Sequence, residues 1–155
     1  MTCCFTGHRT FSWGDDPKKR GELLGKLEQA VDLALSKGVL HFICGNAIGV
    51  DSWAAQIVLE KKKDNPQIFL EIAVPFKNHN TNVPLCLSIQ QKADLVHVVS
   101  DAKDRRSAFY ERNKYMVDNS DMLIAVYETD REKGGTVGTI RHAENKGIEI
   151  IKIAV

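Results

Sequence analysis

The sequence has no long hydrophobic run and almost no excess of charge. No stretch approaches the roughly 18 apolar residues of a membrane-spanning helix, and residues 1–7 predict a strand entering a glycine turn, not a signal peptide. We therefore expect a cytoplasmic protein without a membrane partner. The formal net charge of +1 argues against a general attraction to nucleic acid, although a balanced total can hide a basic cleft.

Cysteine and histidine are few and lack the spacings of metal or redox sites. The four cysteines form no Cys-x-x-Cys pair, and the five histidines are scattered without zinc-ligand spacing, so we expect no metal. Cys3, Cys4 and Cys44 fall in predicted buried strands and Cys86 in a predicted helix. Only 7% of residues are aromatic, which leaves few platforms for stacking the bases of single-stranded nucleic acid.

Short apolar runs alternate with stretches of helical periodicity. Several of the runs are apolar at successive positions, as strands covered on both faces require. The strand-length runs are residues 2–6, 39–44, 68–74, 95–100, 121–127 and 148–153. Helices are predicted around residues 23–35, 50–62, 84–93, 107–118 and 137–146. The alternation predicts a single α/β domain over residues 1–155, built on a doubly wound, mostly parallel six-stranded Rossmann-like sheet with helices on both faces.

Three glycine-bearing turns each follow a predicted strand, at residues 6–9, 44–51 and 134–139. Glycine lets the backbone approach a ligand closely, and the amides that open a helix attract anions. Three such turns in one sheet predict one site for a nucleotide-like small molecule. The Gly-x-Gly-x-x-Gly and Walker-type fingerprints are absent from the sequence, which argues against an ordinary dehydrogenase or P-loop ATPase, and we expect no cofactor.

The first turn contains Gly7, His8 and Arg9. The Arg9 guanidinium is suited to a phosphate group, which it can bind with two hydrogen bonds. His8 is equally well explained as a structural hydrogen-bonding residue. Phe11 and Trp13 in the following loop would either stack on a base or anchor the loop by apolar packing, which is the commoner role.

The second turn contains Gly45, Asn46, Gly49 and Asp51. Its amides would bind an anion and Asp51 would accept hydrogen bonds from ribose hydroxyls. An equally good interpretation is a tight turn whose Asp51 stabilises the first helical turn.

The third turn contains Gly134, Gly135 and Thr136 and is the strongest local indication of a phosphate cradle; the alternative is a plain loop with a threonine N-cap. The charged stretch 128–133 before it is typical of a solvated loop.

Taken together, these motifs resemble the YpsA-like branch of the SLOG superfamily over nearly the whole chain. The matching segments are residues 4–9 (CFTGHR), 45–55 (GNAIGVDSWAA), 111–118 (ERNKYMVD), 120–121 (SD) and 134–136 (GGT). The resemblance implies a Rossmann-like domain whose glycine turns bind nucleotides, nucleotide sugars or related ligands. Because small domains of this superfamily often pair, it also implies a possible homodimer.

Within this superfamily, the cytokinin-activating phosphoribohydrolases cleave a nucleoside monophosphate with an arginine and a glutamate. Arg112 resembles that arginine, although residues 111–113 alone are typical of an exposed salt bridge. Arg141 and His142 stand where the glutamate would fall, and arginine cannot supply the negative charge that an oxocarbenium ion needs. Glu111, or Glu144 about half a helical turn further on, would have to replace it.

The leading interpretation is a domain that senses or sequesters a nucleotide-derived small molecule, such as ADP-ribose, a cyclic derivative or a nucleoside phosphate. In this interpretation, Arg9 and the glycine amides bind a phosphate group, and Arg112 binds a second phosphate or a carboxylate. The alternatives are a nucleotide N-glycosidic hydrolase with Arg112, Glu111 and Glu144 as candidate catalytic residues, and, less favoured, a single-stranded nucleic-acid or protein-interaction module.

Overall fold

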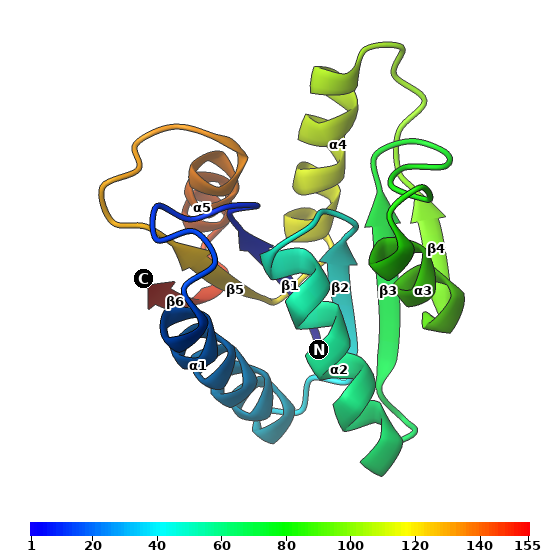
Figure 1. The fold of residues 1–155 in the computed structure, drawn as a ribbon. Coiled ribbons are helices and arrows are strands. Elements are labelled where there is room, and N and C mark those ends of the chain that lie inside the picture. Colours follow the sequence, from blue (N-terminus) through cyan, green and yellow to red (C-terminus); the bar gives the residue numbers. More distant parts are fainter.

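The structure, a computed structural model, describes all 155 residues. Five helices alternate with six strands along the chain (Figure 1). The strands are β1 (Thr2–Gly7), β2 (His41–Gly45), β3 (Phe69–Val74), β4 (Leu95–Val98), β5 (Met122–Tyr127) and β6 (Glu149–Ala154). The helices are α1 (Pro17–Ser36), α2 (Val50–Asp64), α3 (Pro84–Lys92), α4 (Arg105–Asp118) and α5 (Gly135–Lys146).

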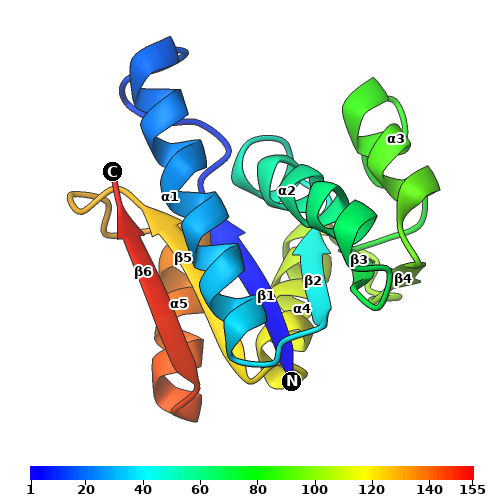
Figure 2. The same cartoon turned by 90° about the horizontal axis from the view of Figure 1, so that it is seen from below.

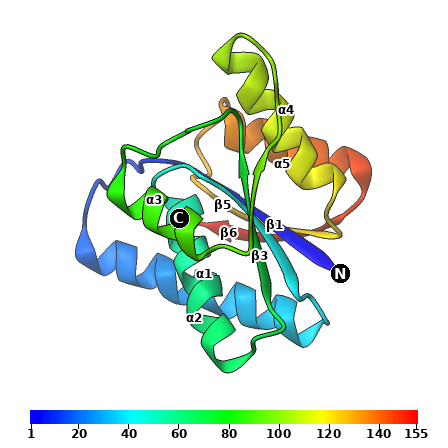
Figure 3. The ribbon, with the colours of Figure 1, turned by 90° about the vertical axis from the view of Figure 1, so that its right-hand side faces the viewer.

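All six strands are parallel and lie in the order β4-β3-β2-β1-β5-β6. The chain moves outward from β1 to β4, then returns to the other side of β1 for β5 and β6. Helices α1, α2 and α3 cover one face of the sheet and α4 and α5 the other (Figures 2 and 3). The doubly wound Rossmann-like prediction is therefore confirmed, and the sheet is wholly parallel.

Side chains that alternate along the strands build two cores of unequal size. Cys3 and Phe5 of β1 belong to a cluster of 24 buried residues under α1 and α2, whereas Cys4 belongs to a cluster of eight under α4 and α5. The two clusters pack the helices against both faces of the sheet. The loops at the carboxyl ends of β1, β2 and β5 therefore begin and end in well-packed elements. All four cysteines are free and buried; the sequence predicts the burial of Cys3, Cys4 and Cys44 in strands, and Cys86 is buried on α3.

The strand β4 departs from the expected pattern of strands covered on both faces. Leu95, Val96 and Val98 are exposed because β4 is the edge strand and only β3, not a helix, packs closely against it. No helix of the structure combines the length and the apolar composition that crossing a membrane requires.

Candidate functional site

A pocket of about 390 Å³ opens at the carboxyl ends of the strands, where the strand order reverses between β1 and β5. In open parallel sheets, ligands bind at such a reversal. We call this cavity the central pocket. Its walls come from the end of β1, the start of α2, the middle of α4 and the start of α5. Of the predicted ligand-binding residues, it is lined by Gly7, His8, Arg9, Asp51, Arg112, Gly134, Gly135 and Thr136.

Gly7 and Gly49 allow the first two loops to pack directly on each other. A Cβ on Gly7 would lie 2.4 Å from the Cβ of Val50, and a Cβ on Gly49 would lie 2.6 Å from the carbonyl oxygen of Arg9. Gly49 also has a φ of +83°, which side-chain-bearing residues rarely adopt. The lack of a side chain at Gly7 and Gly49 lets the loop after β1 pack against the start of α2. Gly49 itself does not line the pocket.

Gly45 lies under two oppositely charged side chains. A Cβ at Gly45 would lie 2.5 Å from Asp51 Oδ2 and 2.8 Å from Arg112 Nη1, so only glycine lets both groups occupy this position. Asp51 accepts a hydrogen bond of 3.3 Å from the amide of Ala47. Burial raises the pKa of Asp51, while Arg112 and the Ala47 amide act to lower it. Asp51 therefore neutralises the first turn of α2 and faces the pocket together with Arg112.

Arg112 is a buried guanidinium with 4% of its surface exposed. It donates from Nε to Asn113 Oδ1 at 2.9 Å and from Nη1 to the carbonyl oxygen of Ala73 at 3.3 Å, yet it forms no salt bridge. Burial lowers its pKa, although the charge of Asp51 opposes this effect. The exposed salt bridge that residues 111–113 alone suggest is not formed by Arg112, whose positive charge is available to an anion in the pocket.

The guanidinium groups of Arg9 and Arg112 both lie over the ring of Phe109 in α4. The Cζ atoms of Arg9 and Arg112 lie 5.3 Å and 5.5 Å from the ring centroid, distances at which the ring attracts a cation. Arg9 forms no salt bridge, so the ring holds it without cancelling its charge. Phe109 is thus a pocket residue that positions both arginines, and sequence reasoning missed it because its position on α4 carries no local motif.

The helix α5 begins at the pocket without a capping side chain. Asp16 and Asp104 cap α1 and α4 through their carboxylates, whereas the cap residue of α5 is Gly134, with φ of +117° and no side-chain bond. No acidic residue lies in its first turn. The first amides of a helix lack intrahelical partners and carry partial positive charge. Gly135 and Thr136 therefore present uncompensated backbone donors to the central pocket.

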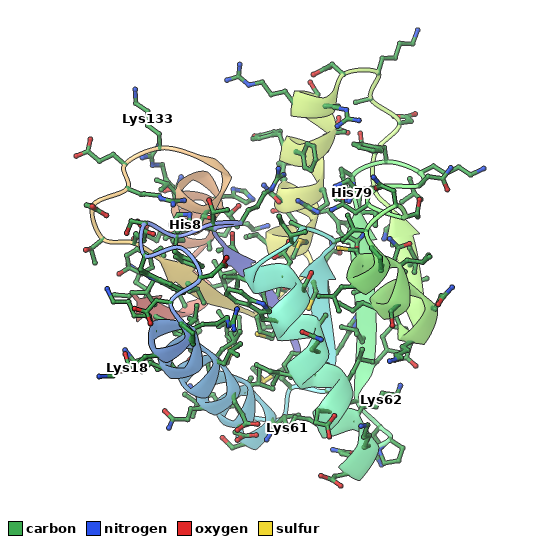
Figure 4. All side chains as sticks on the ribbon, viewed as in Figure 1. His8, Lys18, Lys61, Lys62, His79 and Lys133 are labelled. Carbon is green, nitrogen blue, oxygen red and sulfur yellow. The ribbon has the colours of Figure 1, made fainter.

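A hydrogen-bonded network joins the loops after β1 and β5. His8 Nε2 accepts from the amide of Glu128 at 3.1 Å, Glu128 Oε1 accepts from the amide of Ser12 at 2.6 Å, and Arg131 donates to the carbonyl oxygen of Thr10 at 2.7 Å. Burial, with the charge of Arg131, lowers the pKa of His8. Glu128 is 5% exposed, so the solvated loop expected for residues 128–133 is wrong at this residue. His8 lies between the two loops, and Lys133 lies on the second of them (Figure 4).

Five other candidate residues do not line the central pocket. Gly45 and Gly49 pack as described above. Asn46 is buried and donates to the carbonyl oxygen of His79 at 2.8 Å. Glu111 accepts from the hydroxyl of Ser100, and Glu144 pairs with Lys152 at 3.8 Å.

The aromatic residues of the first loop also lie outside the pocket. Phe11 stacks on Trp13 at 4.9 Å and on Trp53 at 6.3 Å, so the aromatic side chains of this loop anchor it to α2. Asp51 is the one carboxylate among the lining residues.

Several lining residues have no counterpart among the candidates from the sequence, among them Phe109, Asn113, Arg131 and Lys133. The signal that could have indicated Arg131 and Lys133 is their place directly before the glycine turn. With Arg9 and Arg112 they give the pocket four basic side chains against one carboxylate. No group of three or more histidine, cysteine, aspartate or glutamate side chains is placed to hold a metal ion.

Comparison with known proteins identifies the family to which the chain is similar. The model of the YspA SLOG family matches residues 3–153. A UPF0398 protein of Staphylococcus epidermidis is 26% identical over 140 residues, which cover 84% of this chain and 74% of that protein. A UPF0398 protein of Lysinibacillus sphaericus is 26% identical over 96% of this chain and 86% of its own length. A UPF0398 protein of Ligilactobacillus salivarius is 28% identical over 85% of this chain and 77% of its own length.

Proposed function

The chain belongs to the YspA SLOG family, and from that premise we propose that its central pocket binds a nucleotide-derived small molecule. In this proposal the phosphate lies between the start of α5 and the guanidiniums of Arg9 and Arg112. The bound molecule is sensed or sequestered. Candidate ligands are nucleoside phosphates, ADP-ribose and cyclic derivatives of it.

The observation that carries the proposal is the convergence of unsatisfied positive groups on one cavity. The uncapped first turn of α5 offers backbone amides, and Arg112 is a buried guanidinium without a salt bridge. Both lie at the reversal of strand order, where parallel sheets bind their ligands. An anion would satisfy the amides and the guanidinium together, because both donate hydrogen bonds to phosphate oxygens.

Asp51 supplies the complementary group for a sugar. A carboxylate that accepts one weak hydrogen bond has acceptor capacity left for the hydroxyls of a ribose. Its place beside Arg112 over Gly45 puts it in the same pocket as the phosphate donors. The arrangement suits a sugar phosphate better than an isolated inorganic anion.

The first test is to incubate the protein with AMP, ADP-ribose, cyclic ADP-ribose and NAD and to identify by native mass spectrometry what stays bound. The proposal expects at least one of these ligands to be retained intact. If none is retained and none is altered, the assignment of a nucleotide site is wrong.

A charge-reversing variant tests the location of the phosphate. Gly135→Asp places a carboxylate at the start of α5, which favours the helix but repels an anion. The neighbouring space tolerates a side chain, because a Cβ there would lie 3.5 Å from Asn113 Nδ2. We expect a stable protein whose ligand affinity falls by about tenfold or more, since losing a charge-assisted hydrogen bond costs about 1.5–3 kcal/mol. The matched control is Gly138→Asp, where a Cβ would meet nothing within 4 Å. Equal affinities of the two variants would argue against phosphate binding at α5.

A nucleotide N-glycosidic hydrolase is the second candidate, and one observation favours it. Asp51 is a carboxylate in the pocket whose pKa is raised by burial, and such groups often mark catalytic sites. Glu111 and Glu144 do not line that pocket. Release of free base from AMP in the same mass-spectrometric experiment, lost in Asp51→Asn, would establish this function in place of simple binding.

A further inference from the structure

A second chamber adjoins the central pocket on the other side of Arg9 and Phe109. Its volume is about 430 Å³, and these two residues line both cavities. Its remaining walls come from the turn before α2, the loop of residues 75–83 between β3 and α3, and Arg105 at the start of α4. Figure 4 shows His79 on that loop, on the side of the molecule away from Lys133. We call this cavity the outer chamber.

The outer chamber contains two arginines and no carboxylate. Arg9 and Arg105 form no salt bridge, although twelve such pairs occur elsewhere in the molecule. Each guanidinium lies 5.3 Å from the centroid of a phenylalanine ring, Arg9 over Phe109 and Arg105 over Phe76. The rings attract the two exposed cations and leave their hydrogen-bond donors free for an anion.

His79 lines the same chamber and has a ring nitrogen without a hydrogen-bond partner. The residue is 5% exposed, and its Nδ1 is the one buried side-chain polar atom in the structure without a hydrogen-bond partner. Buried polar atoms without partners are rare and costly, so each calls for a physical reason.

The loop that carries His79 is held in place without a ligand. The carbonyl oxygen of His79 accepts hydrogen bonds from Asn46 Nδ2 at 2.8 Å and from Gln90 Nε2 at 3.1 Å. Asn80 Nδ2 donates to the carbonyl oxygen of Asn46 at 2.6 Å. The ring packs edge-on against Phe76 and Phe109, with centroids 5.1 Å and 5.4 Å away. The outer chamber is therefore a preformed site beside the central pocket.

We propose that the bound molecule carries two separate anionic groups, the first held in the central pocket and the second held in the outer chamber between Arg9 and Arg105, against His79. This inference rests on the proposed function and narrows its ligand class. A nucleotide with a second phosphate distant from the first, as in a nucleoside bisphosphate, has this chemistry. Arg9 lines both cavities, so it would contact both groups.

Isothermal titration calorimetry with three nucleotides tests the inference. AMP has one phosphate, ADP has two adjoining phosphates, and adenosine 3′,5′-bisphosphate has two separate ones. We expect the bisphosphate to bind at least about tenfold more tightly than AMP, because a charge-assisted contact contributes that much or more. Arg105→Gln should remove this advantage and leave the affinities of AMP and ADP unchanged.

The matched control is Arg106→Gln, because the neighbouring Arg106 is also exposed but lines the groove between α4 and α5 instead of the outer chamber. If the bisphosphate binds no better than AMP, or if both variants weaken it equally, the second anion site is wrong while nucleotide binding in the central pocket stands. If none of the three nucleotides binds, both the second site and the proposed function are overturned.

Discussion

His79 is surrounded by aromatic rings and cationic side chains, which makes its protonation unfavourable. Burial first, and then the charges of Arg112, Arg9 and Arg105, lower its pKa from 6.5 to about 4. In the unfolded chain the imidazole titrates near its ordinary pKa of about 6.5, so the unfolded state binds more protons between pH 6.5 and pH 4. The stability contributed by neutral His79 is therefore present above pH 6.5 and is lost as the pH falls through 4.

This linkage predicts the pH dependence of unfolding. The free energy of unfolding, measured with urea, should fall by up to about 3 kcal/mol between pH 6.5 and pH 4 because of His79 alone. His79→Gln removes the titrating group and should flatten this part of the profile. His142→Gln is the control, because His142 is accessible and bonded to Asp118. Equal pH slopes of wild type and His79→Gln would show that His79 does not titrate as described.

At the scale of single residues, the sequence predicts types of side chain better than their contacts. The sequence predicts one site for Arg9, Asp51 and Arg112, and these three residues line one cavity. The bond between His8 and the amide of Glu128 could not be predicted, because it joins loops 120 residues apart. The same holds for buried Glu71, which accepts from Tyr115 at 2.6 Å and contacts His41 and His97. No local pattern specifies such pairs.

At the scale of helices and strands, local patterns place the elements well and their ends less well. The number and order of strands and helices are as predicted. Helix α5 starts at Gly135, whereas the sequence predicts a start near residue 137, because glycine disfavours helix and the local pattern assigns Gly134 and Gly135 to the turn. Strand β4 ends at Val98 instead of residue 100 because the ladder with β3 stops there.

The close packing of β1 on α2 gives a prediction at this scale. Gly7→Ala would place a Cβ 2.4 Å from that of Val50, which forces the two elements apart, so we expect a loss of several kcal/mol in stability, on the order of a severe core substitution. Gly25→Ala on the exposed side of α1 meets nothing within 4 Å and should stabilise by about 0.5–1 kcal/mol through helix propensity. Thermal unfolding of both variants measures the two effects. Effects of the same sign would contradict this account of the glycines.

At the scale of the whole molecule, composition conceals the charge of the site. The net charge is +1, yet the central pocket has four basic side chains against Asp51. A net charge near zero does not predict a basic pocket, because acidic residues elsewhere in the chain cancel the positive charge of the pocket in the total. The alternation of strands and helices predicts a doubly wound sheet, and the reversal of strand order then places the loops after β1 and β5 beside each other. The order β4-β3-β2-β1-β5-β6 itself depends on strand pairing between distant segments and could not be read from local patterns.

The most direct test of the central claim is a titration of the ¹⁵N-labelled protein with AMP, followed through the backbone amide resonances. Binding at the start of α5 predicts saturable shifts of Gly135 and Thr136, together with the Arg9 amide after β1. The exposed edge strand β4 should show none, because it lies at the far edge of the sheet. Saturable shifts confined to other surfaces, or none at any AMP concentration, would contradict the account.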